Sequence, residues 1–580
     1  MSSADAHSYS EPDKVRVFHC SLQLAISFAA RTLEGVAWLS VERADLKAPL
    51  TLDTRDLEIR SIECGGRALD FHLSARDPIL GSRLTVDLPP AGDLVAIRYA
   101  TRPEASGLQW LNPEQTTGKR DPFLFSQNQS IHARSWIPLQ DSPGVRITYE
   151  ARIQAHENLL VLMSARHKRR EGTEHFFRMD LPIPPYLVAL AAGNLTFASL
   201  GARTGIYAEG PMLAAAAREF EDTERLVEAV ERLYGPYRWG RYDLLVLPPS
   251  FPFGGMENPC LTFATPTVIA GDKSLVSLVS HELAHSWSGN LVTNATWRDF
   301  WLNEGFTTYL ENRIQEEVYG REQALMEQVL DRLEIEKDLR EFAPADQILH
   351  IDLTGRDPDE GCTHVPYIKG ALFLRQIEQE IGRPKFDRFL KSYFDHFAFR
   401  SITTAEALDY LRRELSPEIA IDEWVFESGL PQTAPRAASP RLEIAADAAR
   451  NFGESHSPAR NLPAARWNTQ EWLEFLRILA RPLPMEKLEE LDSVWHLTGI
   501  GNYEILDEWL LMAIESSYQP AFERLERFLL EVGRTKLLKP LYTALMKTES
   551  GKTLAHSIYA RGRGGYHTIT RTALEKILLF

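Results

Sequence analysis

The feature that most constrains this chain is the pentapeptide His281-Glu282-Leu283-Ala284-His285, followed by Glu304 after a gap of eighteen residues. On an α-helix, residues four apart lie on the same face, about one turn from each other. His281 and His285 could therefore bind one ion, and two imidazoles with one carboxylate suit Zn²⁺ while leaving a fourth position open. Glu282 stands where it can take a proton from water in that position. The pattern predicts a zinc hydrolase centre with Glu282 as general base.

A chance match on a buried helix is the alternative interpretation. For 580 residues with 16 histidines and 80 acidic residues, composition alone gives about 0.06 chance matches of the pentapeptide. Requiring a third acid at a fixed spacing lowers that expectation to about 0.01. We therefore treat the motif as functional.

Length and composition limit the possible classes of protein. A chain of 580 residues is too long for one hydrophobic core and favours three or four domains. A hydrophobic content of 44% and a charged content of 25% are typical of a soluble globular protein. The net charge of −16 argues against a nucleic-acid partner, which a protein normally binds through a basic surface.

The cysteines and the apolar segments bear on the compartment. The chain has four cysteines, Cys20, Cys64, Cys260 and Cys362. They are widely spaced and include no CxxC pair, which disfavours a disulfide framework or a cysteine zinc site. The first residues show neither the basic nor the apolar segment of a secretory signal. Because no apolar run reaches about 18 residues, we expect no membrane span. These observations predict a cytoplasmic enzyme.

Hydrophobic periodicity divides the chain into a multidomain α+β arrangement. Alternation of apolar residues over most of residues 1–195 predicts an all-β domain. Residues 196–430 combine helical spacing from Ala214 to Leu233 with a short apolar strand from Tyr242 to Leu247. The proline-rich stretch 431–441 is typical of a linker. Residues 442–580 contain amphipathic helices, one of which Gly533 is expected to close as a capping glycine.

Four other features suit a binding or catalytic site, although each has an ordinary structural explanation. In Gly254-Gly255-Met256-Glu257, the glycines allow the backbone to approach a ligand closely, and Glu257 adds a fixed carboxylate beside them. The alternative interpretation is an ordinary Gly/Pro turn. The amide-rich stretch 125–132 could hold a peptide backbone or simply turn. Tyr367 could donate to an oxyanion, although packing is the simpler interpretation. Glu311 shares a helix face with Glu304 and could orient an imidazole, or it could be a solvated acid.

The sequence resembles the gluzincin aminopeptidases of peptidase family M1 in three motifs that occur in the same order. They are Gly-Gly-Met-Glu-Asn-Pro at 254–259, HExxH-x18-E at 281–304 and Val-Pro-Tyr-Ile-Lys-Gly at 365–370. The likeness covers nearly the whole chain and is strongest from Tyr237 to Arg313. The resemblance implies a saddle-like all-β N-terminal domain, a thermolysin-like zinc catalytic domain and an all-α C-terminal domain of helical repeats. It also implies that the active site lies at their junction.

The resemblance assigns roles by motif match. The implied zinc ligands are His281, His285 and Glu304, with Glu282 as general base and Tyr367 as the group that stabilises the tetrahedral intermediate. The implied substrate contacts are Gln127 and Gln129 in the amide-rich loop, Gly254, Gly255 and Met256 along the peptide, Glu257 at the free α-amino group, Asp359 beside the first side chain, and Arg534 and Lys536 at a substrate carboxylate.

The implied function is a zinc-dependent aminopeptidase with one Zn²⁺ per chain, which removes the first residue from short peptides with a free N-terminus. Two alternatives stay open, namely an enzyme that also hydrolyses a lipid epoxide in the same site and a catalytically silent scaffold. Cys362 stands where the epoxide-hydrolysing members carry a tyrosine, while Ser130 and Phe306 also depart from the family pattern. None of these departures touches the zinc chemistry. No oligomeric state is predicted.

Overall fold

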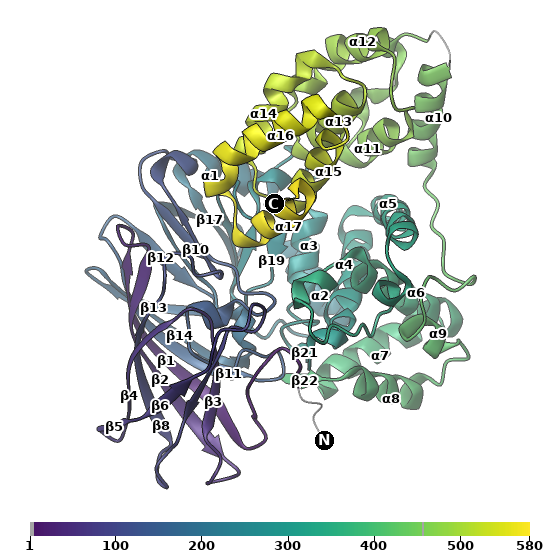
Figure 1. Cartoon of the computed structure of the whole chain (residues 1–580). Coiled ribbons are helices and arrows are strands. Elements are labelled where there is room, and N and C mark those ends of the chain that lie inside the picture. The colour runs from purple at the N-terminus through teal and green to yellow at the C-terminus, as the bar shows by residue number, and fades with distance from the viewer. Residues whose placement is uncertain (1–4, 455–456, 580) are drawn as a thin grey trace.

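The structure, a computed structural model, describes residues 5–454 and 457–579. The chain forms three parts, namely an N-terminal domain of strands, a catalytic domain of strands and helices, and a C-terminal domain of helices (Figure 1). Helix α3 (Ser277–Ala284) of the catalytic domain lies near the junction of the three. This arrangement confirms the predicted three-domain architecture. Within the described ranges, no helix combines the length and apolar character needed to cross a membrane.

The N-terminal domain is built on an eight-stranded sheet with the strand order β13-β14-β11-β1-β2-β8-β4-β5. Besides β1, β2 and β11, its strands are β4 (Glu58–Cys64), β5 (Arg67–Leu69), β8 (Leu94–Ala100), β13 (Arg166–Glu171) and β14 (Glu174–Ile183). Its centre pairs β1 (Val15–Ser27) antiparallel with β2 (Thr32–Arg43) and parallel with β11 (Ile147–Gln154). Alternate residues of β11 are buried, as the period-two pattern predicts, because successive side chains of a strand point to opposite faces. A second sheet contains β10 (Phe123–Ser126), all four residues of which are buried. That strand leads directly into the amide-rich loop.

The catalytic domain begins with a five-stranded sheet of order β16-β17-β18-β20-β19, in which β16 is Leu195–Ser199, β17 is Thr204–Glu209 and β20 is Leu261–Ala264. The predicted apolar strand is β18 (Tyr242–Val246), and β19 (Gly255–Met256) lies at the edge. The segment with helical spacing from Ala214 to Leu233 divides into α1 (Gly210–Glu219) and α2 (Thr223–Tyr234). The carboxylate of Glu219, the last residue of α1, accepts backbone N–H groups of Ala270, Gly271 and Lys273. This contact attaches the end of α1 to a segment that begins 51 residues further along the chain.

The helices of the catalytic domain carry the zinc motif and the residues around it. After α3 come α4 (Trp301–Tyr319), α5 (Arg321–Glu341) and α6 (Gly370–Ile381), followed by α7 (Arg383–His396), α8 (Thr404–Leu415) and α9 (Ile421–Val425). The hydrophobic core is continuous from the N-terminal sheet through these helices. The two domains therefore pack as one body.

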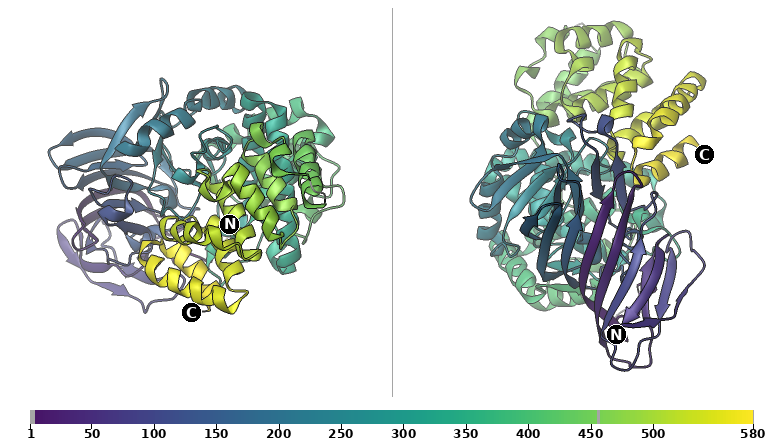
Figure 2. Two further views of the ribbon diagram at one scale, coloured as in Figure 1. Left: turned by 90° about the horizontal axis from the view of Figure 1, so that it is seen from above. Right: turned by 90° about the vertical axis from the view of Figure 1, so that its left-hand side faces the viewer.

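The C-terminal helices run from α10 (Pro440–Glu454) to α17 (Thr568–Leu578) and have a hydrophobic core of their own. Residues 431–439 contain no helix and connect this part to α9 along the outside of the molecule (Figure 1). Seen from above and from the side, the C-terminal helices cover one end of the other two domains (Figure 2).

The C-terminal domain contacts the catalytic domain directly beside the Gly254-Gly255 turn. The Gly533 N–H donates to the Pro249 carbonyl at 2.8 Å, and the Thr535 N–H donates to the Pro252 carbonyl at 2.9 Å. Helix α14 (Phe522–Glu531) has Val532 as its C-cap, which places Gly533 at the expected C′ position, but the φ of Gly533 is not in the left-handed region. A Cβ atom at Gly533 would lie 2.3 Å from the Ser250 carbonyl oxygen. Gly533 is required for close packing between domains.

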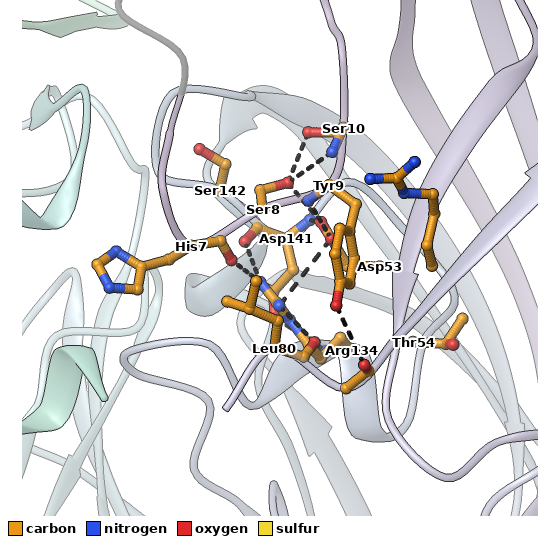
Figure 3. Close-up of polar contacts among 12 residues, drawn as sticks. His7, Ser8, Tyr9, Ser10, Asp53, Thr54, Leu80, Arg134, Asp141 and Ser142 are labelled. Carbon is orange, nitrogen blue, oxygen red and sulfur yellow. Dashed lines mark hydrogen bonds and ion pairs between the residues drawn. The ribbon is translucent and has the colours of Figure 1, made fainter. Parts of the chain in front are cut away.

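A buried guanidinium fixes the first described residues to the N-terminal domain (Figure 3). Arg134 is fully buried, and its Nε donates to Asp141 Oδ2 at 3.0 Å. Its Nη2 donates to the carbonyls of His7 at 2.7 Å and Asp141 at 2.8 Å. The Asp53 carboxylate accepts the Ser8 hydroxyl at 2.6 Å and the Tyr9 N–H at 2.7 Å. Segment 5–10 is therefore an integral part of the fold.

Replacing Arg134 by Met should lower the free energy of unfolding by about 3–5 kcal/mol, because it leaves the buried Asp141 carboxylate without its cation. Arg178→Met is the matched control, since the Arg178 side chain is 58% exposed in its ion pair with Asp180. That control should change the free energy by at most about 0.5 kcal/mol. Urea denaturation followed by circular dichroism checks both variants, and equal midpoints would contradict a stabilising role for the buried network.

Candidate metal centre

Three side chains, from α3, its C-cap residue and α4, converge on one point. Glu304 Oε2 lies 3.3 Å from His281 Nε2 and 3.5 Å from His285 Nε2. The three ligand atoms lie within 4.8 Å of one another. Helix α3 ends at Ala284, but the His285 N–H still donates to the His281 carbonyl at 3.2 Å, which preserves the one-turn spacing of the two imidazoles.

Neighbouring groups fix the orientation of both imidazoles. His281 Nδ1 lies 2.9 Å from Glu311 Oε2, and His285 Nδ1 lies 3.0 Å from the Ser288 carbonyl. A carbonyl oxygen only accepts, so His285 Nδ1 carries the proton and Nε2 keeps its lone pair. Burial lowers the pKa of His285 to about 4, which keeps this ring neutral at pH 7. Both Nε2 atoms are thus directed toward Glu304.

This donor set fits zinc. Glu304 is only 2% exposed, and its Oε2 has no hydrogen-bond partner. A buried carboxylate oxygen without a partner is costly unless a cation compensates it. Two imidazole nitrogens and one carboxylate oxygen form the ligand set of open zinc sites in hydrolases.

Glu282 lies against the backbone of the edge strand β19. It is 5% exposed, and a Cβ atom placed on Gly255 would lie 2.3 Å from Glu282 Oε1. Ligand atoms of Glu282, Glu257 and His285 also lie within 4.8 Å of one another. Gly255 therefore leaves the space that the Glu282 carboxylate fills beside the metal ligands.

Glu257 supplies a further buried carboxylate beside that of Glu282. It is 3% exposed, its Oε1 has no hydrogen-bond partner, and burial raises its pKa to about 7. Asn290 Nδ2 donates to the Glu257 carbonyl at 2.7 Å and so fixes the backbone of this residue. A cationic group would satisfy this buried oxygen.

Tyr367 reaches the centre from a π-helical turn, Val365–Lys369, which leads into α6. Its ring lies parallel to that of His281, with centroids 5.9 Å apart and an interplanar angle of 17°. The turn approaches α4 closely because Gly305 and Gly370 face each other. A Cβ atom on Gly305 would lie 2.8 Å from the Gly370 Cα. The two glycines thus allow Tyr367 to lie beside the metal ligands.

The amide-rich loop from the N-terminal domain contacts the catalytic domain at two points. Gln127 Nε2 lies 3.2 Å from Met256 Sδ, and its buried Oε1 has no partner. Asp359 accepts the Ser130 N–H at 3.1 Å and lies 3.1 Å from His132 Nε2. Gln129, between these contacts, is 9% exposed. The structure therefore places Gln127, Gln129 and Asp359 together at the interface of the two domains.

Arg534 and Lys536, which we call the basic pair, have an acidic partner that sequence reasoning did not identify. Arg534 Nη1 donates to Glu504 Oε1 at 2.6 Å, and Lys536 Nζ lies 3.4 Å from Glu504 Oε2. Burial opposes ionisation of Glu504, but Lys536 and Arg534 nevertheless lower its pKa to about 2. Arg534 is 7% exposed, whereas the Lys536 side chain is 55% exposed. A Cβ atom on Gly254 would lie 3.2 Å from Arg534 Nη2, which places this pair beside the glycine turn.

Sequence reasoning missed further residues that support the site. They are Ser288, Asn290 and Thr307 near the metal ligands, His132 beside Asp359, and Glu504 beside Arg534. Ser288 and Asn290 directly follow the zinc motif, so their proximity to it was visible. The contact of His132 with Asp359 joins two domains, and that of Glu504 with Arg534 joins two segments of the C-terminal domain that are 30 residues apart, so neither has a local sequence signature.

Comparisons with known proteins agree with this geometry. The chain matches the family models of the Peptidase M1 N-terminal domain at residues 9–187, the Peptidase family M1 domain at 218–425 and the Leukotriene A4 hydrolase C-terminal domain at 467–578. A leukotriene A-4 hydrolase of Xenopus laevis is 36% identical over 607 residues, covering 99% of both chains. A leucine aminopeptidase 2 of Yarrowia lipolytica is 36% identical over 612 residues, covering 99% of this chain and 93% of that protein.

A solved structure of yeast LTA4 hydrolase in complex with bestatin matches with a TM-score of 0.93 at 30% identity, covering 100% of this chain and 98% of that one. The fold and the donor set thus define a zinc metallopeptidase of the M1 type. The chain belongs to peptidase family M1 and is a zinc-dependent aminopeptidase with the C-terminal domain found in leukotriene A4 hydrolases.

Gly255→Ala should reduce kcat by about 10²-fold, because the added methyl would displace Glu282 by about 1 Å. The zinc content measured by atomic emission should stay at one ion per chain, since His281, His285 and Glu304 are untouched. Gly210→Ala is the matched control, because a Cβ atom there meets nothing within 4 Å. Full activity of Gly255→Ala would show that the Glu282 carboxylate has room to move.

Proposed function

We propose that His281, His285 and Glu304 hold the zinc ion and that Glu282 is the general base in the removal of the first residue from short peptides. The observation that supports this most strongly is the buried, unpartnered Glu304 Oε2, which lies 3.3 and 3.5 Å from the two Nε2 atoms. When bound, zinc would polarise the scissile carbonyl and lower the pKa of the attacking water to about 7.

Residues of the chain perform the proton transfers. Glu282 takes a proton from the attacking water and returns it to the leaving amine. The Tyr367 hydroxyl donates to the oxyanion as charge develops on the former carbonyl oxygen. Burial raises the pKa of Tyr367 well above the usual range, so the phenol stays protonated and available as a donor. Glu311 and the Ser288 carbonyl contact the Nδ1 atoms of His281 and His285 and so keep the two imidazoles in place.

Glu257 determines where the peptide is cut. A protonated α-amino group would give the buried Glu257 carboxylate the cation that it lacks and would place the first peptide bond next to Glu282. Gln127, Gln129, Gly254, Gly255 and Met256 then lie along the peptide, and Asp359 is suited to a cationic first side chain. This arrangement selects free N-termini.

The length of the substrate depends on the basic pair. Arg534 and Lys536 would receive the terminal carboxylate of a short peptide, most simply a tripeptide. Glu504 already neutralises part of this charge, and the exposed Lys536 is the better placed of the two to bind a substrate from solvent. Carboxylate binding here is expected to increase affinity modestly rather than to be essential.

Glu282→Gln should retain one zinc ion per chain and lose about 10²–10⁴-fold in kcat, because the amide cannot accept the proton. The assay uses an aminoacyl-p-nitroanilide together with metal analysis of the same sample. Glu317→Gln, an exposed change on α4, is the control and should match the wild type. Substantial activity of zinc-loaded Glu282→Gln would remove Glu282 from its assigned role.

Glu257→Gln should lower kcat/KM by about 10–10²-fold for peptides with a free N-terminus, because a charge-assisted hydrogen bond is lost. The same peptides with an acetylated N-terminus should be hydrolysed as slowly as by the wild type. The ratio between the two forms is the measured quantity. A proportional loss on both forms would argue against an amine-binding role.

A second candidate function is hydrolysis of a lipid epoxide in the same site. The observation that favours it is the match to the leukotriene A4 hydrolase C-terminal domain, together with the similarity to the Xenopus laevis enzyme of that name. Cys362 lies near this site, 4.0 Å from the Ser130 hydroxyl. Incubation with leukotriene A4 and analysis of the diol product distinguishes a bifunctional enzyme from a dedicated aminopeptidase.

A further inference from the structure

The segment 5–10, which we call the N-terminal strap, contacts the loop that carries Asp359. His7 is 4% exposed, and its Nε2 lies 3.1 Å from the Leu353 carbonyl and 3.1 Å from the Arg356 carbonyl. Both acceptors are carbonyl oxygens, so the His7 Nε2–H is the donor in both contacts. The strap thus crosses from the N-terminal domain to residues 352–362 of the catalytic domain, which we call the Asp359 loop.

The strap itself is held firmly. The His7 carbonyl accepts from the buried Arg134 Nη2 at 2.7 Å, and its N–H donates to Asp5 Oδ1 at 2.9 Å. Asp5 in turn accepts the Ser142 hydroxyl at 2.6 Å. Figure 3 shows the His7 ring pointing away from this network, while its backbone is part of it. The backbone of His7 is therefore a fixed base from which the imidazole reaches the Asp359 loop.

The same loop has a second attachment to the N-terminal domain, at Asp359 itself. Asp359 accepts the Ser130 N–H at 3.1 Å and contacts His132 Nε2 at 3.1 Å. His132 is followed after one residue by Arg134, the residue that binds the strap. The N-terminal domain therefore contacts the loop at Leu353 and Arg356, through His7, and three residues further along at Asp359, through Ser130 and His132.

We propose that His7 is a positioning residue for Asp359, and that the N-terminal strap thereby sets the selectivity for cationic first side chains. This inference rests on the proposed aminopeptidase function and on the assignment of Asp359 to the first side chain. The carboxylate must keep its distance from a substrate cation to distinguish it from a neutral side chain, and a displacement of about 1 Å is enough to weaken such a contact. Removing the His7 donor releases the loop at Leu353 and Arg356, so that the Asp359 carboxylate can shift although the residue itself is unchanged.

The test uses the full-length, zinc-loaded enzyme with arginine and alanine p-nitroanilides as probes. The measured quantity is the ratio of kcat/KM for the arginine reporter to that for the alanine reporter. His7→Leu keeps apolar volume but removes the donor, and it should lower the ratio about three- to tenfold, mainly through a higher KM for the arginine reporter. His7→Gln, whose amide N–H can still donate, should recover most of the loss.

The matched control is Ser8→Ala. Ser8 is the next residue in the strap, and its hydroxyl donates to Asp53 at 2.6 Å. The strap keeps its Arg134 and Tyr9 contacts in this variant, so the ratio should stay within about twofold of the wild type. A loss of thermal stability in His7→Leu without a change in the ratio would show a purely structural role for His7 and overturn the proposal.

A double-mutant cycle with Asp359→Asn tests whether His7 acts through Asp359. Asp359→Asn should lower the ratio by itself, and adding His7→Leu should then lower it no further, because coupled residues are not additive. Equal effects of His7→Leu in both backgrounds would overturn the proposal, and so would an unchanged ratio in Asp359→Asn. Should His7→Leu fail to fold, His7→Asn replaces it, because its shorter side chain cannot reach both carbonyls.

Failure of the underlying function gives a different result. If the zinc-loaded wild type hydrolyses neither reporter, the aminopeptidase proposal is wrong and the inference about His7 falls with it. If the wild type hydrolyses both reporters and His7→Leu shows the same ratio of kcat/KM as the wild type, the aminopeptidase proposal stands and the positioning role of His7 is refuted.

Discussion

The structure depends on a carboxylate that is placed where only a cation can satisfy it. Glu304 is almost fully buried, and its Oε2 lies between two imidazole nitrogens without a hydrogen-bond partner. Without a bound ion, this arrangement would be destabilising, since an uncompensated buried charge is costly. Zinc binding and folding of the catalytic domain are therefore expected to support each other.

The elements around the metal ligands serve to hold this convergence. Helix α3, its C-cap residue His285 and helix α4 supply the proposed ligands, and Glu311 and the Ser288 carbonyl fix the two rings through their Nδ1 atoms. The facing pair of Gly305 and Gly370 lets the turn with Tyr367 approach α4. Small residues thus matter here as much as polar ones, because they decide how closely the backbone segments meet.

The other two domains complete the site from outside the catalytic domain. The N-terminal domain contributes the amide-rich loop and, through His7 and His132, two attachments of the Asp359 loop. The C-terminal domain contributes Arg534 and packs Gly533 against the turn before Gly254. In the proposed function, substrate recognition is therefore shared among three domains, whereas bond cleavage is assigned to one of them.

The sequence by itself determined what is local. Helical periodicity indicates that His281 and His285 share a face, period-two alternation indicates the N-terminal sheet, and the proline-rich stretch indicates the connection to the C-terminal helices, because each follows from neighbouring residues. Tertiary structure alone decided which distant groups meet. The pairing of Glu504 with Arg534, the contact of His7 with the Asp359 loop, the hydrogen bonds of Glu219 with residues 270–273 and the packing role of Gly533 all join segments far apart in sequence. Such contacts depend on how helices and domains pack, and no local pattern encodes that packing.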